Sequence, residues 1–372
     1  MPTVIHSVNP YLEPTTVWIH DQIRSLERYE PVVYSRYTRN RDRFPVDRLV
    51  DFTSGGWLTG LSDRVRIRLS GTYPRYGAQA VRDSADLIHA HFGQEGFRCL
   101  DAKGEAGIPL VTTFYGLDVS ALPKIAVWQK RFGRLFLEGD LFLAEGPHMA
   151  SMLRGIGCPE EKVRVQPLGV DLSAFTYRSP SQREAAGEVL MYASLREKKG
   201  HRYGLEAFAR IAAEFDARMT IIGDGPLRTD LESRTAVLGV QDRVRFLGSL
   251  DHDTCKQHLA EATVLLYPSV IASDGDTEGG APVGILEAMA SGLPVVSTRH
   301  ADIPFVTNDG AAAYLTEERN VDGLVEGLRE ILGAQSEAVT YAEAGREAVE
   351  SRHALEAQGA ALEARYDEAI GA

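Results

Sequence analysis

Short apolar runs recur along the chain, and a stretch of helical length separates each run from the next. Such runs, rich in β-branched residues and bounded by Gly, Pro or Asp, predict buried strands of parallel sheets joined by crossover helices. The predicted fold class is therefore α/β, doubly wound. The predicted strands are Thr3–Val8, Pro31–Tyr34, Leu87–Ala90, Pro109–Phe114 and Leu141–Ala144, then Val189–Tyr192, Arg218–Ile222, Val244–Leu247, Thr263–Tyr267, Pro294–Ser297 and Ala312–Leu315.

The series of predicted strands breaks once, near the middle of the chain. Pro167–Asp171 closes the first series, and Ser179–Ser181 has the composition of a linker. A chain of 372 residues also exceeds the size at which one hydrophobic core stops growing. We therefore predict an N-terminal domain over residues 1–172 and a C-terminal domain over residues 173–350. The last part of the chain, rich in Ala, Glu and Arg, predicts one or two amphipathic helices.

Residues 278–296 hold the most informative local pattern. Gly279, Gly280 and Pro282 precede a predicted amphipathic helix, and Gly292 follows it. Pro282 fits the first helical turn, and Gly292 fits a position just past the helix end. Glycines let backbone N–H groups approach a ligand, and a helix N-terminus favours an anion such as phosphate. Glu287 on the same helix would reach a hydroxyl beside that phosphate, unless it simply faces water.

The composition is that of an ordinary globular protein, with 44% hydrophobic and 25% charged residues. The three cysteines, Cys99, Cys158 and Cys255, lie far apart and predict reduced thiols in a reducing compartment such as the cytoplasm. The segment Met1–Ser7 lacks the charged and apolar regions of a signal peptide. No run of about 18 apolar residues occurs in the sequence, so we expect no membrane span.

The net charge of −12 is unevenly distributed. Residues 1–80 hold 11 arginines, no lysine and 8 acidic residues. This positive balance predicts an anion-facing surface, for a membrane leaflet or a phosphorylated acceptor, although the interspersed acids also fit a solvated face. Nucleic-acid binding is disfavoured, because the whole chain is acidic and shows no basic–aromatic pattern. The arginines form two groups, Arg36, Arg39, Arg41, Arg43 and Arg48, and Arg64, Arg66, Arg68 and Arg75.

Three strand ends in the second half carry turns that suit a nucleotide. Residues 194–200 follow a predicted strand and include Arg196 and Lys199, whose charges would neutralise a diphosphate. Gly223–Pro226 and Phe246–Gly248 close two further strands. Because ligands bind beyond the carboxyl ends of parallel strands, we expect these turns at one edge of the sheet. A solvated turn is the alternative for the basic loop.

Several motifs follow one another along the chain. They are Asp86–Gly93, Thr112–Ser120, Gly157–Val163, Gly223–Pro226, Phe246–Gly248, Tyr267–Ser269 and Glu278–Pro294. Together they resemble the retaining glycosyltransferases of family 4, which have the GT-B architecture, and the resemblance covers nearly the whole chain. It implies two Rossmann-like domains facing across a cleft, with the acceptor on the first domain and a nucleotide sugar on the second. A final helix, residues 351–372, would return to the N-terminal domain.

The resemblance also implies roles for the donor-side residues. Glu287 would bind the ribose hydroxyls, Lys199 would contact the diphosphate, and Glu278 would contact the donor sugar. The further donor-binding positions are Arg196, Ser194, Gly223, Leu247, Gly248, Gly279, Gly280, Ala281 and Pro282, with backbone groups near Leu247 and Gly248 meeting the base. Positive side chains and a helix N-terminus replace a metal in such enzymes, so we expect neither metal nor cofactor. Asp274–Asp276 is interpreted as solvated or turn-forming.

Three positions depart from the family's pattern. Glu278 and Glu287 have eight residues between them, where the family has seven. Ser194 stands where the family has an arginine, and Arg196 is the nearest substitute. Tyr115 stands where the family has a histidine. A tyrosine would donate a hydrogen bond to an attacking hydroxyl but would be a poor general base, and simple packing is the alternative.

The acceptor-side candidates follow strands of the first half. Asp118 would orient an acceptor or cap the following turn. Glu13 follows the first predicted strand and is expected to overhang the cleft. His91 would line the cleft, although a structural role fits both His91 and His89, which are too few for a metal site. The residues assigned to the reacting centre are Lys199, Glu278, Tyr115 and Asp118.

We therefore predict a cytoplasmic hexosyltransferase that acts on a glycan, glycolipid or small-molecule acceptor, with possible peripheral contact with the inner membrane face. The acceptor hydroxyl would attack from the face that the diphosphate leaves, and a phosphate oxygen would serve as the base. A UDP-sugar is mildly preferred over a GDP-sugar. The alternatives are a nucleotide-sugar epimerase of the same fold and a catalytically degenerate nucleotide-sugar-binding protein.

Overall fold

The computed structural model describes residues 1–13, 16–53, 57–183 and 187–371. Within it the chain forms two compact units. Unit 1 comprises Met1–Gly169 and Leu355–Ala372, and unit 2 comprises Val170–Ala354. The polypeptide therefore passes from one unit to the other twice, after Gly169 and after Ala354, close to the boundaries predicted at residues 172 and 350.

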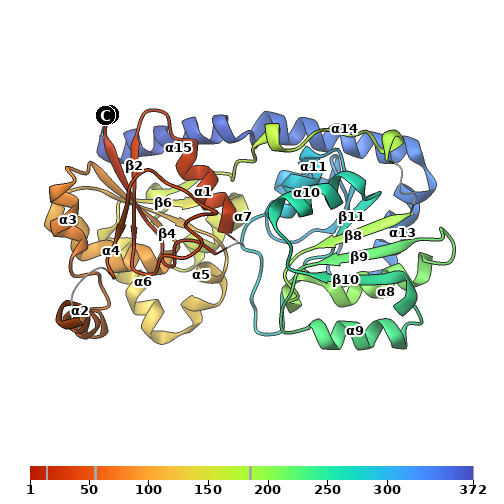
Figure 1. The fold of residues 1–372 in the computed structure, drawn as a ribbon, viewed down its shortest axis with the longest axis horizontal. Coiled ribbons are helices and arrows are strands. Elements are labelled where there is room, and N and C mark those ends of the chain that lie inside the picture. The colour runs from red at the N-terminus through yellow and green to blue at the C-terminus, as the bar shows by residue number, and fades with distance from the viewer. Residues whose placement is uncertain (14–15, 54–56, 184–186, 372) are drawn as a thin grey trace. The chain divides into compact units, whose positions relative to one another are not determined.

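Unit 1 is built on a seven-stranded parallel sheet in the order β3-β2-β1-β4-β5-β6-β7 (Figure 1). Its central strands are buried along their whole length, as parallel strands covered on both faces must be. The strands are β1 (Thr3–Ser7), β2 (Glu30–Ser35), β3 (Leu49–Asp51), β4 (Leu87–His91), β5 (Leu110–Phe114), β6 (Leu141–Ala144) and β7 (Val163–Val165). The helices are α1 (Val17–Arg24), α2 (Trp57–Ser70), α3 (Tyr76–Arg82), α4 (Gly93–Ala106), α5 (Leu117–Ser120), α6 (Ala126–Glu138), α7 (Pro147–Gly155) and α15 (Leu355–Ile370).

Unit 2 is built on a six-stranded parallel sheet in the order β10-β9-β8-β11-β12-β13. The strands are β8 (Glu188–Tyr192), β9 (Arg218–Ile222), β10 (Val244–Gly248), β11 (Val264–Tyr267), β12 (Val295–Thr298) and β13 (Tyr314–Thr316). The helices are α8 (His201–Ile211), α9 (Arg228–Val237), α10 (His252–Glu261), α11 (Val283–Ala290), α12 (Ile303–Val306), α13 (Val321–Gly333) and α14 (Gln335–Arg352). Every strand predicted in this half is present, and no end differs from the prediction by more than two residues.

Both sheets use the same doubly wound strand order, and this order decides where a ligand can bind. The chain winds outward from β1 through β2 to β3, and then returns to β4 on the other side of β1. In unit 2 the chain winds outward from β8 through β9 to β10, and then returns to β11 on the other side of β8. Ligands of such sheets bind beyond the carboxyl ends of the strands, where the winding direction reverses. The candidate sites are therefore the β1/β4 edge of unit 1 and the β8/β11 edge of unit 2.

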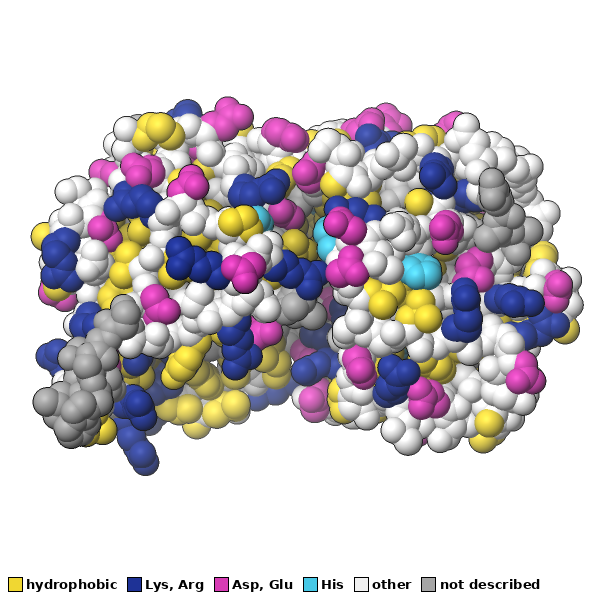
Figure 2. Space-filling model, in the orientation of Figure 1, with side chains coloured by type: hydrophobic (Ala, Val, Ile, Leu, Met, Phe, Trp, Pro, Cys, Tyr) yellow, Lys and Arg dark blue, Asp and Glu magenta, His cyan; other side chains and the backbone are white. Residues whose placement is uncertain are grey.

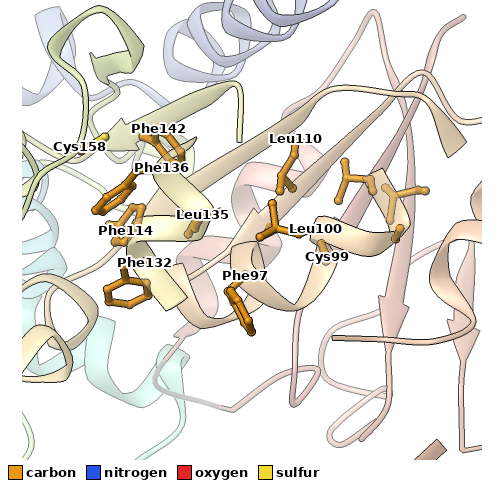
Figure 3. Packing of buried hydrophobic residues seen from close by; sticks show 14 of the residues in the cluster. Phe97, Cys99, Leu100, Leu110, Phe114, Phe132, Leu135, Phe136, Phe142 and Cys158 are labelled. Atoms are coloured by element: carbon orange, nitrogen blue, oxygen red, sulfur yellow. The ribbon is translucent and has the colours of Figure 1, made fainter. Parts of the chain in front are cut away.

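Aromatic side chains fill the core on one face of the unit 1 sheet (Figure 3). Phe114 from β5 and Phe142 from β6 meet Phe132 and Phe136 of α6, all buried. The rings of Phe136 and Phe142 pack edge to face, with centroids 5.3 Å apart. Burial of each such ring stabilises the fold by about 2–3 kcal/mol, and the cluster fixes β5, whose end carries Tyr115.

The other face of the same sheet is covered by α15, although its sequence lies at the far end of the chain. Leu362 and Tyr366 join a buried cluster with Val4 and Leu87. Glu363 accepts hydrogen bonds from the backbone N–H groups of Glu27 and Arg28. In the part of the chain that the structure describes, every helix is too short or too polar to cross a lipid bilayer.

Candidate functional site

At the β8/β11 edge of unit 2, the loop after β8 contacts the loop after β11. This close contact is possible because a glycine stands there. The loop after β8 ends at Gly200, whose φ is +66° and where a Cβ would lie 1.8 Å from the carbonyl oxygen of Pro268. Gly223 contacts the start of the loop after β8 in the same way. Its φ is +133°, and a Cβ there would lie 2.0 Å from the carbonyl oxygen of Ala193. No larger residue fits either contact. The glycines thereby bring Lys199 beside the loop that follows β11.

Lys199 lies in an ion pair at the centre of this edge. Its Nζ is 2.7 Å from Oε2 of Glu278 and donates to the Tyr267 hydroxyl at 2.9 Å. Oε1 of Glu278 accepts from the Ser269 hydroxyl at 2.8 Å. Burial alone would raise the pKa of Glu278, but the ammonium groups of Lys199 and Lys198 bring it below its usual value. At pH 7 the pair is therefore fully charged, although both side chains are largely buried.

The loop that carries Glu278 is held by two further contacts. Lys198 pairs with Asp276 at 3.2 Å and donates to the carbonyl oxygen of Thr277. His300 Nε2 lies 2.8 Å from the Thr277 hydroxyl and 3.2 Å from the Glu278 backbone nitrogen. The Asp274–Asp276 interpretation holds only in part: Asp274 does accept from the backbone of Asp276 in a turn, but Asp276 is buried and ion-paired rather than solvated. Between Glu278 and α11 the chain bends at Gly279, where φ is +81°.

Glu287 projects from α11 and is almost completely buried. Its Oε1 lies 2.9 Å from Nε2 of His252. Its Oε2 has no hydrogen-bond partner among the described residues. Leaving a buried carboxylate oxygen unpaired costs about 1–3 kcal/mol or more, so this oxygen requires a donor from water or from a ligand. Glu287 thus faces the interior of the site and not bulk water.

His201 was not singled out by sequence reasoning. It begins α8 directly after Gly200, is buried, and neither ring nitrogen has a partner among the described residues. Burial and the nearby Lys199 ammonium lower the pKa of His201 to about 3, so its ring is neutral at pH 7. The sequence held no signal for it beyond its place next to the basic loop.

The remaining donor-side predictions differ in outcome. The Arg196 side chain is exposed. The 3-10 turn Glu197–Lys199 instead directs two lysines inward, where Lys198 pairs with Asp276 and Lys199 with Glu278. Pro282 caps α11 from outside and is not in its first turn, since its ψ of 131° is extended. Three donor-side residues are half-buried, Ser194, Leu247 and Ala281. At this edge also lie the predicted donor-side glycines, Gly223, Gly248, Gly279 and Gly280. Gly292 takes the left-handed conformation just past α11, as predicted.

The β1/β4 edge of unit 1 is lined by neutral rings. The Tyr115 hydroxyl lies 2.7 Å from Nδ1 of His91, and Nε2 of His91 lies 3.0 Å from Nδ1 of His6. His89 contacts the hydroxyls of Tyr366 and Thr113, each at 2.7 Å. Burial lowers the pKa of His6 to about 3 and holds those of His89 and His91 well below the usual value. The hydrogen bond with His91 therefore holds the Tyr115 hydroxyl in position.

The three histidines have the spacing of a possible metal site. One ring nitrogen from each of His6, His89 and His91 lies within 4.8 Å of the others. Pairing of β1 with β4 places His6 directly beside His89, which sequence alone does not show. However, both nitrogens of His89 and of His91 already contact other side chains, so the arrangement fits a hydrogen-bonded network.

The carboxylate of Asp118 is occupied by hydrogen bonds from the protein's own backbone. It is fully buried, and its two oxygens accept from the backbone nitrogens of Gly93, Tyr115 and Gly116 at 2.9–3.1 Å. Burial raises its pKa, and these three bonds oppose that shift. The geometry favours the capping alternative over a catalytic role. Glu13 lies half-exposed after β1 and pairs with Arg39 at 2.8 Å.

Two family models match consecutive parts of the chain. The model described as Glycosyltransferase Family 4 matches residues 16–174, and the model described as Glycosyl transferases group 1 matches residues 186–334. The amylovoran biosynthesis glycosyltransferase AmsK of Erwinia amylovora is 31% identical over 294 residues, which cover 74% of this chain and 72% of AmsK. The chain belongs to the group 1 glycosyltransferases.

Other members of the group 1 glycosyltransferases are also similar to the chain. WcaL of Salmonella typhimurium, named for colanic acid biosynthesis, is 35% identical over 250 residues, or 66% of this chain. The match covers 61% of WcaL, so the chain spans about three fifths of that relative's length. The structure of Anabaena HepE in complex with UDP aligns with a TM-score of 0.81 at 18% identity, over 99% of this chain and all of HepE. The predicted family and GT-B fold are thereby confirmed.

Proposed function

We propose that this chain transfers a hexose from a nucleoside diphosphate sugar to a hydroxyl of a glycan, glycolipid or small acceptor. The observation that carries the proposal is Glu287, a buried carboxylate with one unpaired oxygen at the β8/β11 edge. A ribose hydroxyl is a donor of the right kind for that oxygen. Lys199, on the loop beside it, would meet the diphosphate.

The proposed reaction retains the configuration of the sugar. The acceptor hydroxyl attacks the anomeric carbon while the bond to the diphosphate breaks, and a phosphate oxygen takes the proton. Lys199 and the backbone N–H groups at the start of α11 stabilise the charge that develops on the phosphate. Because these groups supply positive charge, we propose that the reaction needs no metal and no cofactor.

Lys199 is already charged and held in place before the donor arrives. Glu278 and Tyr267 fix its ammonium, so little reorganisation is needed when the diphosphate binds. On binding, the phosphate oxygens compete with Glu278 for the ammonium. Glu278, anchored by Ser269, then remains as an acceptor for a hydroxyl of the donor sugar.

The relatives support the nature of the substrates. HepE was solved with UDP and with UDP-glucose, which favours a uridine nucleotide here. WcaL and AmsK are named for the biosynthesis of colanic acid and amylovoran, which favours a growing polysaccharide as the acceptor. We further propose that unit 1 meets an anionic membrane on its cytoplasmic side, with its exposed arginines as the support.

A nucleotide panel followed by product analysis tests the proposal. UDP should raise the melting temperature more than GDP or ADP, because a ligand bound to the native state stabilises it by mass action. With UDP-glucose and a glycan acceptor, the product should carry an α-linked glucose. A changed sugar nucleotide formed without any acceptor would identify an epimerase. Tight UDP binding with no transfer to any acceptor would leave only a binding protein.

A further inference from the structure

The helix α2 in unit 1 has one face packed inward and one face in solvent. Asp63 is buried, and its Oδ2 lies 2.8 Å from Nε of Arg75. Ile67, one turn later, packs against the buried cluster of unit 1. Residues four apart lie on the same side of a helix, so these two define the inner face. Figure 1 shows α2 at the periphery of unit 1.

The outer face of α2 carries a stripe of exposed apolar side chains. Leu61, Val65 and Leu69 expose 50%, 51% and 82% of their surface. They are also spaced four apart, on the side of the helix opposite Asp63 and Ile67. A single exposed leucine needs no explanation, but three on successive turns form a continuous strip.

Three exposed arginines flank this stripe. Each residue turns a helix by about 100°, so Arg64 and Arg68 lie on one side of Val65 and Arg66 on the other. Among the described residues, no carboxylate pairs with any of the three, whereas Arg39, Arg48 and Arg75 each have an acidic partner. Figure 2 shows Lys and Arg side chains around the corner of unit 1 where α2 lies.

We propose that the outer face of α2 lies in the interface of an anionic lipid bilayer. The apolar strip would enter the boundary of the acyl chains, and the arginines on both sides would extend to lipid phosphates. A second copy of this chain fits less well, because two such faces would oppose their unpaired arginines. Helix α2 would thus be the element of unit 1 that makes the membrane contact proposed above. This contact does not depend on sugar transfer.

Vesicle sedimentation tests the inference without any activity measurement. Vesicles of phosphatidylcholine mixed with phosphatidylglycerol should bind the protein at low salt, and phosphatidylcholine alone should bind it far more weakly. Replacing Arg64, Arg66 and Arg68 by glutamine should weaken binding about a hundredfold, from roughly fivefold per arginine. The triple change Leu61→Ser, Val65→Ser and Leu69→Ser should also abolish sedimentation. Because at least half of each side chain is exposed, the melting temperature should fall only slightly.

Matched variants in unit 2 serve as controls. Replacing Arg202, Arg210 and Arg218, all exposed, by glutamine removes the same charge and should leave vesicle binding intact. Val237→Ser removes an apolar side chain that is 85% exposed on α9 and should also have no effect. Equal weakening by the two arginine sets would mean non-specific charge attraction and would overturn the inference. So would a concentration-dependent dimer that the serine variant abolishes, because the stripe would then be a contact between copies.

Discussion

The two sheets share one strand order, yet their ligand-binding edges differ in electrical character. At the β8/β11 edge of unit 2, Lys199 and Glu278 are charged, and Glu287 keeps an unpaired oxygen. At the β1/β4 edge of unit 1, the histidines are neutral and Tyr115 keeps its proton, because burial holds its pKa well above the usual value.

This difference teaches that the topology sets the place of a site and the side chains set its chemistry. A diphosphate requires fixed positive charge, which Lys199 provides at the unit 2 edge. A sugar hydroxyl requires neutral donors and acceptors, such as the Tyr115 hydroxyl. In unit 1 the buried carboxylate of Asp118 is satisfied by backbone donors. The comparison supports the proposal that unit 2 activates the donor and unit 1 positions the acceptor.

The largest expected effect is on turnover in Lys199→Ala. Loss of the ammonium should lower kcat by about a hundredfold to a thousandfold, as removal of a single charge-stabilising donor does. Steady-state kinetics with saturating UDP-glucose measures this. Lys256→Ala in unit 2, where the lysine pairs with the exposed Asp253 and lies over the Phe175 ring, is the control and should retain full activity. Unchanged turnover in Lys199→Ala would show that the charged edge does not serve the reaction.

Asp118→Ala should reduce stability by about 3 kcal/mol or more, because three buried backbone N–H groups lose their acceptor. Urea unfolding at pH 7 measures this loss. Asp118→Asn keeps one oxygen and should lose less. Under conditions where both variants are folded, the KM for the donor should match that of the unaltered protein. A stable Asp118→Ala protein with no activity would instead restore the catalytic role.

Glu287→Gln should weaken UDP binding about tenfold to a hundredfold, which corresponds to about 1.5–3 kcal/mol for a hydrogen bond to a charged group. Calorimetry with UDP and with 2′-deoxy- and 3′-deoxy-UDP separates this contact from others. The unaltered protein should bind at least one deoxy nucleotide more weakly than UDP, and the variant should not distinguish them. A variant that still distinguished them would place the ribose elsewhere.

A further prediction concerns the pH dependence of stability. His6 and His201 have pKa values of about 3 in the folded protein, against about 6.5 when unfolded. The unfolded chain therefore binds more protons below pH 6.5, and the free energy of unfolding falls as the pH decreases, by up to about 1.4 kcal/mol per pH unit for each histidine.

Unit 1 holds three buried histidines with lowered pKa values, His6, His89 and His91. As the pH falls, its amides should therefore lose protection from hydrogen exchange faster than those of unit 2. Amide hydrogen exchange of β4 and β8 at pH 7 and pH 5 compares them. His201→Gln should flatten the dependence of unit 2 alone. Equal loss at both strands in the unaltered protein would contradict the comparison.

Much of the fold could be predicted from the sequence because buried parallel strands are continuous apolar runs. Leu141–Ala144 and Arg218–Ile222 were predicted to the residue. β3 and β7 were missed, since three residues at a sheet edge show no period. The fold class followed from these runs, and the family and its GT-B architecture followed from motifs spread over both halves.

Side-chain partners were much harder to predict, because they depend on strand order and loop direction. His6 lies beside His89 only because β1 pairs with β4. Arg196 was expected at the diphosphate site, but the turn after it directs Lys198 and Lys199 inward instead. The placement of Glu287 on an inward-facing helix was anticipated, while its partner His252 was not.

The position of α15 has a consequence for synthesis on the ribosome. Unit 2 emerges and can fold while the sheet of unit 1 still lacks the helix that covers Val4, Leu87 and Leu143. Until Leu362 and Tyr366 are translated, that apolar face stays open to water and to chaperones. Unit 1 is therefore completed only after unit 2 has been translated, and its open face stays vulnerable to aggregation until then.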